Sequence, residues 1–404
     1  MNRRELLAHA AGAAVLSALP LPEASSMTVD DNPFLKGGFA PVSDEVTLEN
    51  LPVTGRLPAG LAGVYRRNGP NAAFKPISYT YPFDGDGMIH ALSIRDGKAS
   101  YRNRFVQTAE LQVERKAGRA LWGGIEKPMI PDPALLPPGM APRPNKNWAN
   151  INVIRHGGRL LALYEAGMPY ELGDDLATKG IHDFGGRLRG AMTAHPFLDP
   201  ATDEMIFYRY RPDAPPFLTV FVADKSGAIV AERHVDTGVP YMIHDVAVTA
   251  RKIVFVLAPV VFDLEGRREG KPFLAWRPEL GTRIAILDRA DLQAPVAWLD
   301  AEPFFVFHFL NAYDERDAIV VDYVRHASFN DTRGDARPQM ARMTIAGRSI
   351  AHASTASPAI EFPRHDDRLR GLKHRYGYAA TVARGRNSAV LRFDRRDGSV
   401  AARD

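Results

Sequence analysis

The sequence of 404 residues contains no cysteine. Disulfide bonds, thiolate zinc sites and a cysteine nucleophile are therefore all excluded, and a metal ion would have to be held by His, Asp or Glu side chains. Lysine and arginine exceed aspartate and glutamate only by 51 to 47, and no basic run with interleaved aromatic residues is present. The charge pattern therefore predicts no nucleic-acid partner.

The sequence also lacks a hydrophobic run that is long enough to cross a bilayer as a helix. Its N-terminus carries Arg3 and Arg4 ahead of a mildly apolar, alanine-rich stretch that ends near Leu21. This order resembles a twin-arginine export signal, although no clear A-x-A cleavage site follows. We therefore predict that residues 1–26 are a signal or a disordered segment, and that residues 27–404 form one domain. The signal predicts a periplasmic protein; the alternative is a cytoplasmic protein peripheral to a membrane.

Amphipathic helical patterns are scarce, and from about residue 60 the chain alternates between turns and short segments rich in β-branched and aromatic residues. Examples of these strand-like segments are 158–165, 203–212, 217–236, 252–259, 282–289 and 318–326. Residues 95–97, 224–227 and 396–398 have the composition of hairpin turns. The pattern predicts an all-β sandwich, barrel or propeller, and the chain length favours a propeller although no crisp internal repeat is present.

One segment, residues 123–147, is rich in proline and is therefore expected to be a long loop. Its apolar residues are Met129, Ile130, Leu135, Leu136 and Met140. Such a loop either lines the entrance for an apolar ligand or touches a membrane surface, or it is a connector that caps the core. The sequence leaves these interpretations open.

Three histidines lie in matching apolar surroundings near expected strand ends: His195 in AMTAHPFLDP, His244 in VPYMIHDVAVT and His308 in FVFHFLNAYDE. A single buried histidine is usually neutral and hydrogen-bonded in a core. Three of them, 49 and 64 residues apart, are also compatible with successive blades that each send one imidazole to a common axis. Because neutral imidazole binds Fe, Cu, Zn and Ni, a metal site is the functional alternative.

Two carboxylates stand at the edges of apolar runs. Glu165 ends LLALYE, and Glu361 begins EFPRH. One interpretation is a surface ion pair, which Glu361 would form with Arg364 or a neighbour. The other is that each carboxylate accepts the Nδ1–H of a metal-bound imidazole and thereby fixes the tautomer of that imidazole. Other histidines in polar, charged or glycine-containing surroundings are interpreted as ordinary, and they include His156, His182, His326, His352, His365 and His374.

Several stretches together resemble the carotenoid cleavage oxygenase family, and they follow in family order from about residue 32 to the C-terminus. These stretches are LPAGLAGVYRRNGPN (57–71), YPFDGDGMIHALSI (81–94), ASYRNRFVQT (99–108), NWANINVIRHGGRLLALYEAGMPYEL (147–172), TAHPFLDPATDEMIFY (193–208), MIHDVAVTARKIVFV (242–256), FVFHFLNAYDE (305–315) and IEFPRHDDRLRGLKHRYGYA (360–379).

The resemblance implies a seven-bladed β-propeller with a loop-rich apolar cap on one face and a non-haem Fe(II) on four histidines at its axis. It implies that O₂ splits a conjugated C=C bond into two carbonyl products. His195, His244 and His308 fall on three of the four ligand positions, and Glu165 and Glu361 on two of the three carboxylates that hydrogen-bond the ligands. Ground-state O₂ needs a redox metal, so zinc would not serve this chemistry.

The sequence departs from the family after residue 379. The strand with the third carboxylate and the C-terminal fourth histidine have no counterpart, since no histidine follows His374. We therefore expect a C-terminally truncated member whose last blade is incomplete and whose iron has three protein ligands.

Substrate choice rests on residues beside the expected site. Stilbene-cleaving relatives place a lysine where this chain has Tyr164, so the resemblance favours a carotenoid or apocarotenoid. Met242 and Phe307 resemble tunnel-lining positions, with plain core packing as their alternative. The other functions considered are a stilbene or phenylpropanoid dioxygenase, an inactive propeller that binds an apolar ligand, and a zinc hydrolase on three histidines.

Overall fold

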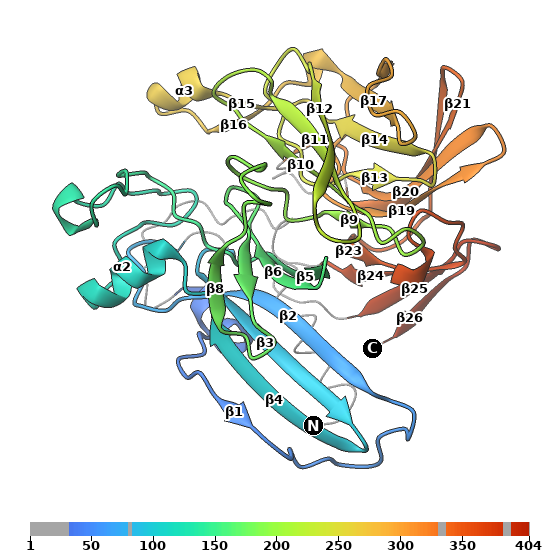
Figure 1. The fold of residues 1–404 in the computed structure, drawn as a ribbon. Coiled ribbons are helices and arrows are strands. Elements are labelled where there is room, and N and C mark those ends of the chain that lie inside the picture. The colour runs from blue at the N-terminus through green and yellow to red at the C-terminus, as the bar shows by residue number, and fades with distance from the viewer. Residues whose placement is uncertain (1–31, 80–82, 330–336, 383–388, 404) are drawn as a thin grey trace. The chain divides into compact units, whose positions relative to one another are not determined.

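The computed structural model of the chain (Figure 1) describes residues 32–79, 83–329, 337–382 and 389–403. These residues form two compact units, one that ends at Ala194 and one that begins at His195. The expected signal, residues 1–26, lies outside the described residues, and the boundaries of a single domain over residues 27–404 stay a prediction. No helix within the described ranges is long and apolar enough to cross a membrane.

The first unit holds two four-stranded antiparallel sheets, with the strand orders β1-β4-β3-β2 and β5-β6-β7-β8. Their strands are β1 (Thr47–Leu48), β2 (Gly63–Asn71), β3 (Asp86–Arg95), β4 (Lys98–Phe105), β5 (Asn152–His156), β6 (Arg159–Leu163), β7 (Tyr170–Leu172) and β8 (Thr178–Ile181). An apolar layer that includes Ile89 and Ala91 on one sheet and Leu160 and Tyr170 on the other joins them. Three short 3₁₀ helices complete the unit: η2 (Pro33–Leu35), η3 (Gly37–Phe39) and η4 (Pro133–Leu135).

Helix α2 (Ala109–Ala117) connects the two sheets of the first unit and has clear end signals. The Thr108 side chain accepts a hydrogen bond from the Leu111 N–H and caps the N-terminus. Gly118 ends the helix with a φ of 65°, a left-handed conformation that suits glycine.

The second unit holds four four-stranded antiparallel sheets. Each sheet is built from one continuous stretch of the chain, and the sheets follow one another in sequence order. The first two sheets consist of β9 (Phe197–Leu198), β10 (Met205–Tyr210), β11 (Leu218–Ala223) and β12 (Ile229–Val235), and of β13 (Ala247–Val248), β14 (Lys252–Leu257), β17 (Thr282–Asp288) and β18 (Ala297–Ala301). The last two sheets consist of β19 (Phe309–Glu315), β20 (Ala318–Arg325), β21 (Gln339–Ala346) and β22 (Ser349–Ser354), and of β23 (Ile360–Arg364), β24 (Tyr376–Thr381), β25 (Val390–Asp394) and β26 (Val400–Arg403). The smaller elements are β15 (Val260–Phe262), which pairs with β16 (Leu274–Trp276), α3 (Leu264–Arg268), η5 (Pro278–Leu280) and η6 (Asp367–Leu369).

Successive sheets of this unit pack face to face through continuous apolar layers. Strand β14, with the sequence KIVFVL, is covered on both faces. Ile253 and Phe255 pack with the sheet of β9–β12, whereas Val254 and Val256 pack with the sheet of β19–β22. Neighbouring residues of a strand point to opposite faces, so a strand covered on both sides needs an unbroken apolar run. This repeated packing of antiparallel four-stranded sheets is the construction of propeller blades.

The expected strand segments and the three hairpin turns are confirmed. The turns at 95–97, 224–227 and 396–398 connect β3 to β4, β11 to β12 and β25 to β26, respectively. The expected blade count is corrected, since the described residues form six four-stranded sheets rather than seven. The last of the six sheets is complete, because β23–β26 follow one another as hairpins and pair in sequence order.

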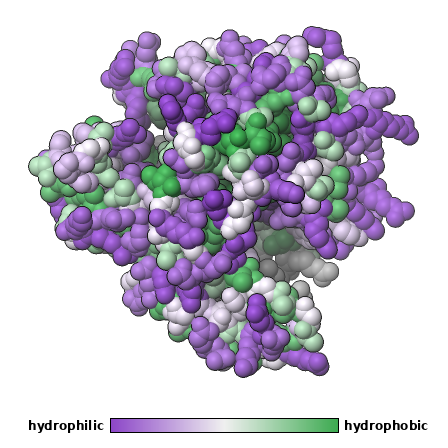
Figure 2. All heavy atoms as spheres, viewed as in Figure 1, coloured by the Kyte–Doolittle hydropathy of each residue, from purple (hydrophilic) through white to green (hydrophobic). Residues whose placement is uncertain are grey.

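The proline-rich segment 123–147 is a loop, as expected, with one turn of 3₁₀ helix at Pro133–Leu135. Its apolar residues divide into two groups: Leu136 and Met140 pack against Trp122 and its neighbours, whereas Ile130 is 59% exposed. The other exposed members are Met129 and Leu135. The loop therefore caps part of the first unit and also presents apolar side chains to solvent. Figure 2 shows that small apolar areas of this kind interrupt a mostly hydrophilic surface.

Candidate metal centre

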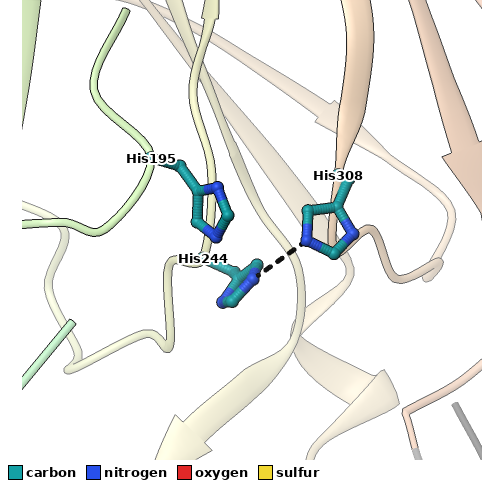
Figure 3. A group of neighbouring side chains, drawn as sticks. All are labelled: His195, His244 and His308. Atoms are coloured by element: carbon teal, nitrogen blue, oxygen red, sulfur yellow. Dashed lines mark hydrogen bonds between the residues drawn. The ribbon is translucent and has the colours of Figure 1, made fainter. Parts of the chain in front are cut away.

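The three histidines occupy equivalent places in three successive sheets of the second unit. His195 lies two residues before β9, His244 three residues before β13 and His308 directly before β19. Each of these strands is the first strand of its sheet and forms one edge. Because the sheets pack in sequence, the repeated position brings the imidazoles together (Figure 3).

The ligand nitrogens of these three rings lie within 4.8 Å of one another. His244 Nε2 and His308 Nε2 are 3.2 Å apart, and the ring centroids of His195 lie 4.6 Å and 5.2 Å from those of His244 and His308. Two imidazoles that bind one ion at about 2.1 Å, at angles between tetrahedral and octahedral values, have nitrogens about 3.0–3.4 Å apart. The His244–His308 pair has this spacing, and the three histidines together could hold a metal ion such as iron.

The protonation state of His195 and the hydrogen bond of His308 also suit a metal ligand, which must offer a lone pair. Burial, with the nearby His244 and His308 rings, holds the pKa of His195 well below its usual range, so that imidazole is neutral. His308 Nδ1 lies 2.8 Å from Glu361 Oε2. A carboxylate accepts hydrogen bonds, so Nδ1 carries the proton and Nε2 keeps its lone pair towards the other two histidines.

Glu361 is fully buried, at 0% exposure, and this excludes the surface ion pair with Arg364 as its explanation. Burial by itself would raise the pKa of Glu361, but its electrostatic interactions and hydrogen bonds with His308 and His326 outweigh it, so that this pKa lies well below the usual range. The carboxylate is therefore ionised and available as an acceptor.

The backbone of β23 is bent at the point where it presents Glu361. The register of β23 against β24 shifts between Glu361 and Arg364, and Phe362 has a φ of 58°. A bulky residue with a positive φ is uncommon and costs free energy, and such residues cluster at functional sites. The Phe362 N–H donates a hydrogen bond of 2.6 Å to Glu361 Oε2, and the Phe362 ring lies 5.3 Å from the His308 ring. The bend therefore holds the carboxylate in position beside His308.

Asp245 and His326 contribute to this centre, and neither was identified from the sequence. Asp245 Oδ2 accepts from the Phe309 N–H at 3.0 Å, which ties the loop of His244 to the residue after His308. His326 Nε2 lies 2.7 Å from Glu361 Oε1. His326 ends the apolar run AIVVDYVRH, the same strand-end position that drew attention to the other three histidines, but its arginine neighbour caused it to be interpreted as ordinary.

The two expected lining residues of the second unit are buried close to the histidines. Phe307 and Met242 belong to one apolar cluster with Phe305, and the Phe307 ring meets the His244 ring edge-on at 5.5 Å. Tyr164 is buried and Glu165 is half-buried in the first unit, where they follow β6. The predicted roles of Tyr164 beside the substrate and of Glu165 beside a ligand stay predictions.

A stack of propeller-type sheets that brings three imidazoles together defines the class of protein: a β-propeller with a three-histidine cluster that could hold a metal ion. Comparisons with known proteins identify the family. Residues 39–403 match the family model of the retinal pigment epithelial membrane protein. A carotenoid cleavage oxygenase of Mycobacterium tuberculosis is 34% identical over 412 aligned residues, which cover 88% of this chain and 78% of the relative.

Two further relatives are named for isoeugenol and lignostilbene. An isoeugenol monooxygenase of Pseudomonas nitroreducens is 31% identical over 296 residues, covering 72% of this chain and 61% of the relative. The crystal structure of a lignostilbene dioxygenase of Pseudomonas brassicacearum superposes with a TM-score of 0.81 at 28% identity, covering 95% of this chain and 84% of that one. The chain therefore belongs to the carotenoid cleavage oxygenase family, which confirms the resemblance noted in the sequence.

Proposed function

We propose that this protein is a non-haem Fe(II) dioxygenase that cleaves a conjugated C=C bond of a carotenoid or apocarotenoid with O₂ and yields two carbonyl products. The convergence of His195, His244 and His308 is the observation that carries the proposal. Bound Fe(II) supplies the one-electron chemistry that lets ground-state O₂ react with a closed-shell alkene.

The residues around the three histidines have separate tasks in this proposal. The three imidazoles would hold the ion, and Glu361 would keep His308 in the tautomer whose Nε2 lone pair faces it. Phe307 and Met242 provide an apolar wall beside His244 that excludes water and favours a hydrocarbon substrate. No side chain is required as a general acid or base.

A direct test measures metal content and oxygen consumption together. The purified chain, reconstituted with Fe(II) under argon, is expected to retain about one iron per chain by mass spectrometry of the metal. It is then expected to consume O₂ and form aldehydes when an apocarotenal is added. Retention of zinc in place of iron, with hydrolysis of an ester substrate, would favour the zinc hydrolase.

A stilbene-type substrate is the second candidate, and it is supported by the names of the isoeugenol and lignostilbene relatives. Tyr164 argues for the polyene, since it stands where stilbene-cleaving relatives place a lysine. A panel that contains an apocarotenal and a hydroxystilbene, scored for aldehyde products, separates the two. An inactive, ligand-binding propeller is the third candidate, and it predicts substoichiometric iron and no oxygen uptake with either substrate.

The location of the protein is a separate proposal. We propose export to the periplasm by residues 1–26, on the twin-arginine pattern at Arg3 and Arg4. Replacement of both arginines by lysine is expected to retain the protein in the cytoplasm of a Tat-competent host, as shown by cell fractionation. Vesicle flotation tests the proposed peripheral membrane contact of the loop that carries Met129, Ile130 and Leu135.

A further inference from the structure

We infer that His326 is a positioning residue of this metal centre: its Nε2–H holds Glu361, and Glu361 in turn holds the ligand His308. The inference deepens the proposed function and rests on it, since it presumes that His308 binds the metal ion. It adds a fourth histidine to the site in a role other than that of a ligand.

The hydrogen bonds of Glu361 show what His326 does. Oε2 accepts from His308 Nδ1 at 2.8 Å and from the Phe362 N–H at 2.6 Å, and Oε1 accepts from His326 Nε2 at 2.7 Å. With 0% exposure, the carboxylate cannot turn to water if one of these donors is removed. A buried ionised carboxylate needs partners for both oxygens, so loss of the His326 donor would free the side chain to rotate away from His308.

His326 is itself fixed relative to His308. The two residues flank the same hairpin, since His308 directly precedes β19 and His326 directly follows β20. The backbone of His326 pairs with that of Phe305, with N–H to O distances of 2.9 Å in both directions. The His326 ring also meets Phe305 and Phe307 edge-on, at centroid distances of 5.8 Å and 5.5 Å.

Two histidines that flank one hairpin therefore hold a carboxylate of the next sheet from both sides. Glu361 lies on β23, whereas the histidines lie at the ends of β19 and β20. A carboxylate held at both oxygens has one orientation, and a ligand hydrogen-bonded to such a carboxylate has one tautomer and one ring rotation. His326 is not a substitute for a fourth ligand, because its Nε2 is directed at Glu361.

The test compares three substitutions in the full-length chain. His326→Phe keeps an aromatic ring against Phe305 and removes the donor, whereas His326→Gln keeps an N–H at similar reach. His352→Phe is the matched control, because His352 lies on β22 of the same sheet and pairs with Tyr323 Oη at 2.9 Å. The measured quantities are the Co(II) dissociation constant, the visible absorption spectrum of bound Co(II) and the far-UV circular dichroism.

We expect His326→Phe to weaken Co(II) binding about tenfold, at the lower end of the effect of residues that orient metal ligands, and to shift the absorption bands. His326→Gln is expected to recover most of the affinity, and His352→Phe to match the wild type. Unchanged affinity and spectrum in His326→Phe would overturn the inference, as would a His326→Gln variant that behaves like His326→Phe with an intact fold.

A double-mutant cycle with Glu361→Gln decides whether His326 acts through the carboxylate. We expect His326→Phe to change the affinity of the Glu361→Gln protein by less than about twofold, because the carboxylate that His326 would hold is already gone. Additive losses would contradict the inference. Failure of the wild type to bind any metal would instead overturn the proposed function and the inference with it, so the two failures are distinguishable.

Discussion

Two buried carboxylate clusters, one in each unit, differ in the kind of partner that neutralises them. In the first unit Lys146 Nζ lies 2.7 Å from Asp86 Oδ1 and 2.5 Å from Glu114 Oε2, and all three side chains are at most 5% exposed. In the second unit Glu361 lies between His308 and His326. Both clusters place carboxylates away from water, where they need close partners.

The lysine cluster consists of one ammonium held between two carboxylates. Burial alone would lower the pKa of Lys146, but Asp86 and Glu114 outweigh it and raise this pKa, so the ammonium stays charged. The face of Trp148 covers the ammonium at 4.3 Å, and Glu114 also accepts from the Leu121 and Trp122 N–H groups. One ammonium thus holds both carboxylates, and the backbone N–H groups that Glu114 accepts tie helix α2 to the chain that follows it.

The histidine cluster leaves a nitrogen available for another partner, because an imidazole has two nitrogens. His308 gives the Nδ1–H to Glu361 and keeps Nε2 for the cluster with His195 and His244. A buried carboxylate stabilises the fold when its partner has a single polar atom, as Lys146 does. When its partner is an imidazole, the carboxylate can instead orient the second ring nitrogen as a metal ligand. We therefore expect substitutions in the two clusters to separate stability from metal binding.

His244→Ala should have the largest effect on the second cluster. We expect it to abolish retention of iron, because two imidazoles remain, while the circular dichroism of the β-rich fold is largely unchanged. Metal content after gel filtration checks this result. His234→Ala, which removes a histidine that is 58% exposed, is the control and should retain iron. Stoichiometric iron in His244→Ala would show that the ligand assignment is wrong.

Lys146→Met should have the largest effect on stability. It leaves Asp86 and Glu114 buried without their cation, and breaking a buried ion pair in this way costs about 3–5 kcal/mol. Urea unfolding followed by fluorescence measures the loss, and the iron content per folded chain should stay that of the wild type. A loss below 1 kcal/mol would mean that water reaches the two carboxylates.

Glu361→Gln should weaken metal binding without removing it. The amide has a donor where one of the two histidines needs an acceptor, so His308 or His326 loses its partner. We expect the metal affinity to fall by about ten- to a hundredfold. Competition with a chromogenic chelator measures this change, and unchanged affinity would leave Glu361 with a purely structural role.

Lys252→Met should have the smallest effect and sets the baseline for Lys146→Met. Lys252 pairs with Asp288 at 2.7 Å, but both side chains are about one-third exposed, at 34% and 35%. Such surface ion pairs contribute about 0–1 kcal/mol. The same urea unfolding experiment should therefore give nearly the wild-type midpoint, and a loss equal to that of Lys146→Met would remove the distinction between buried and exposed pairs.

Much of the site followed from the sequence because its residues stand in distinctive local surroundings. His195, His244 and His308 each interrupt an apolar run, and the structure brings their nitrogens together. The interpretation of Glu361 as the partner of an imidazole agrees with its contact to His308. His326 also ends an apolar run, but its arginine neighbour hid this signal, and its hydrogen bond to Glu361, 35 positions away, leaves no local pattern in a single sequence.

The sequence by itself determined the β-rich fold class, since unbroken apolar runs such as KIVFVL, separated by turn residues, can only bury both faces of a strand within stacked sheets. It also determined which histidines stand at the strand ends. Only the tertiary structure decided that Glu361 is shared by two histidines and that the last four described strands complete a sheet. The physical reason is that side-chain hydrogen bonds and strand pairing depend on distances in space, which hydrophobic periodicity along the chain does not encode.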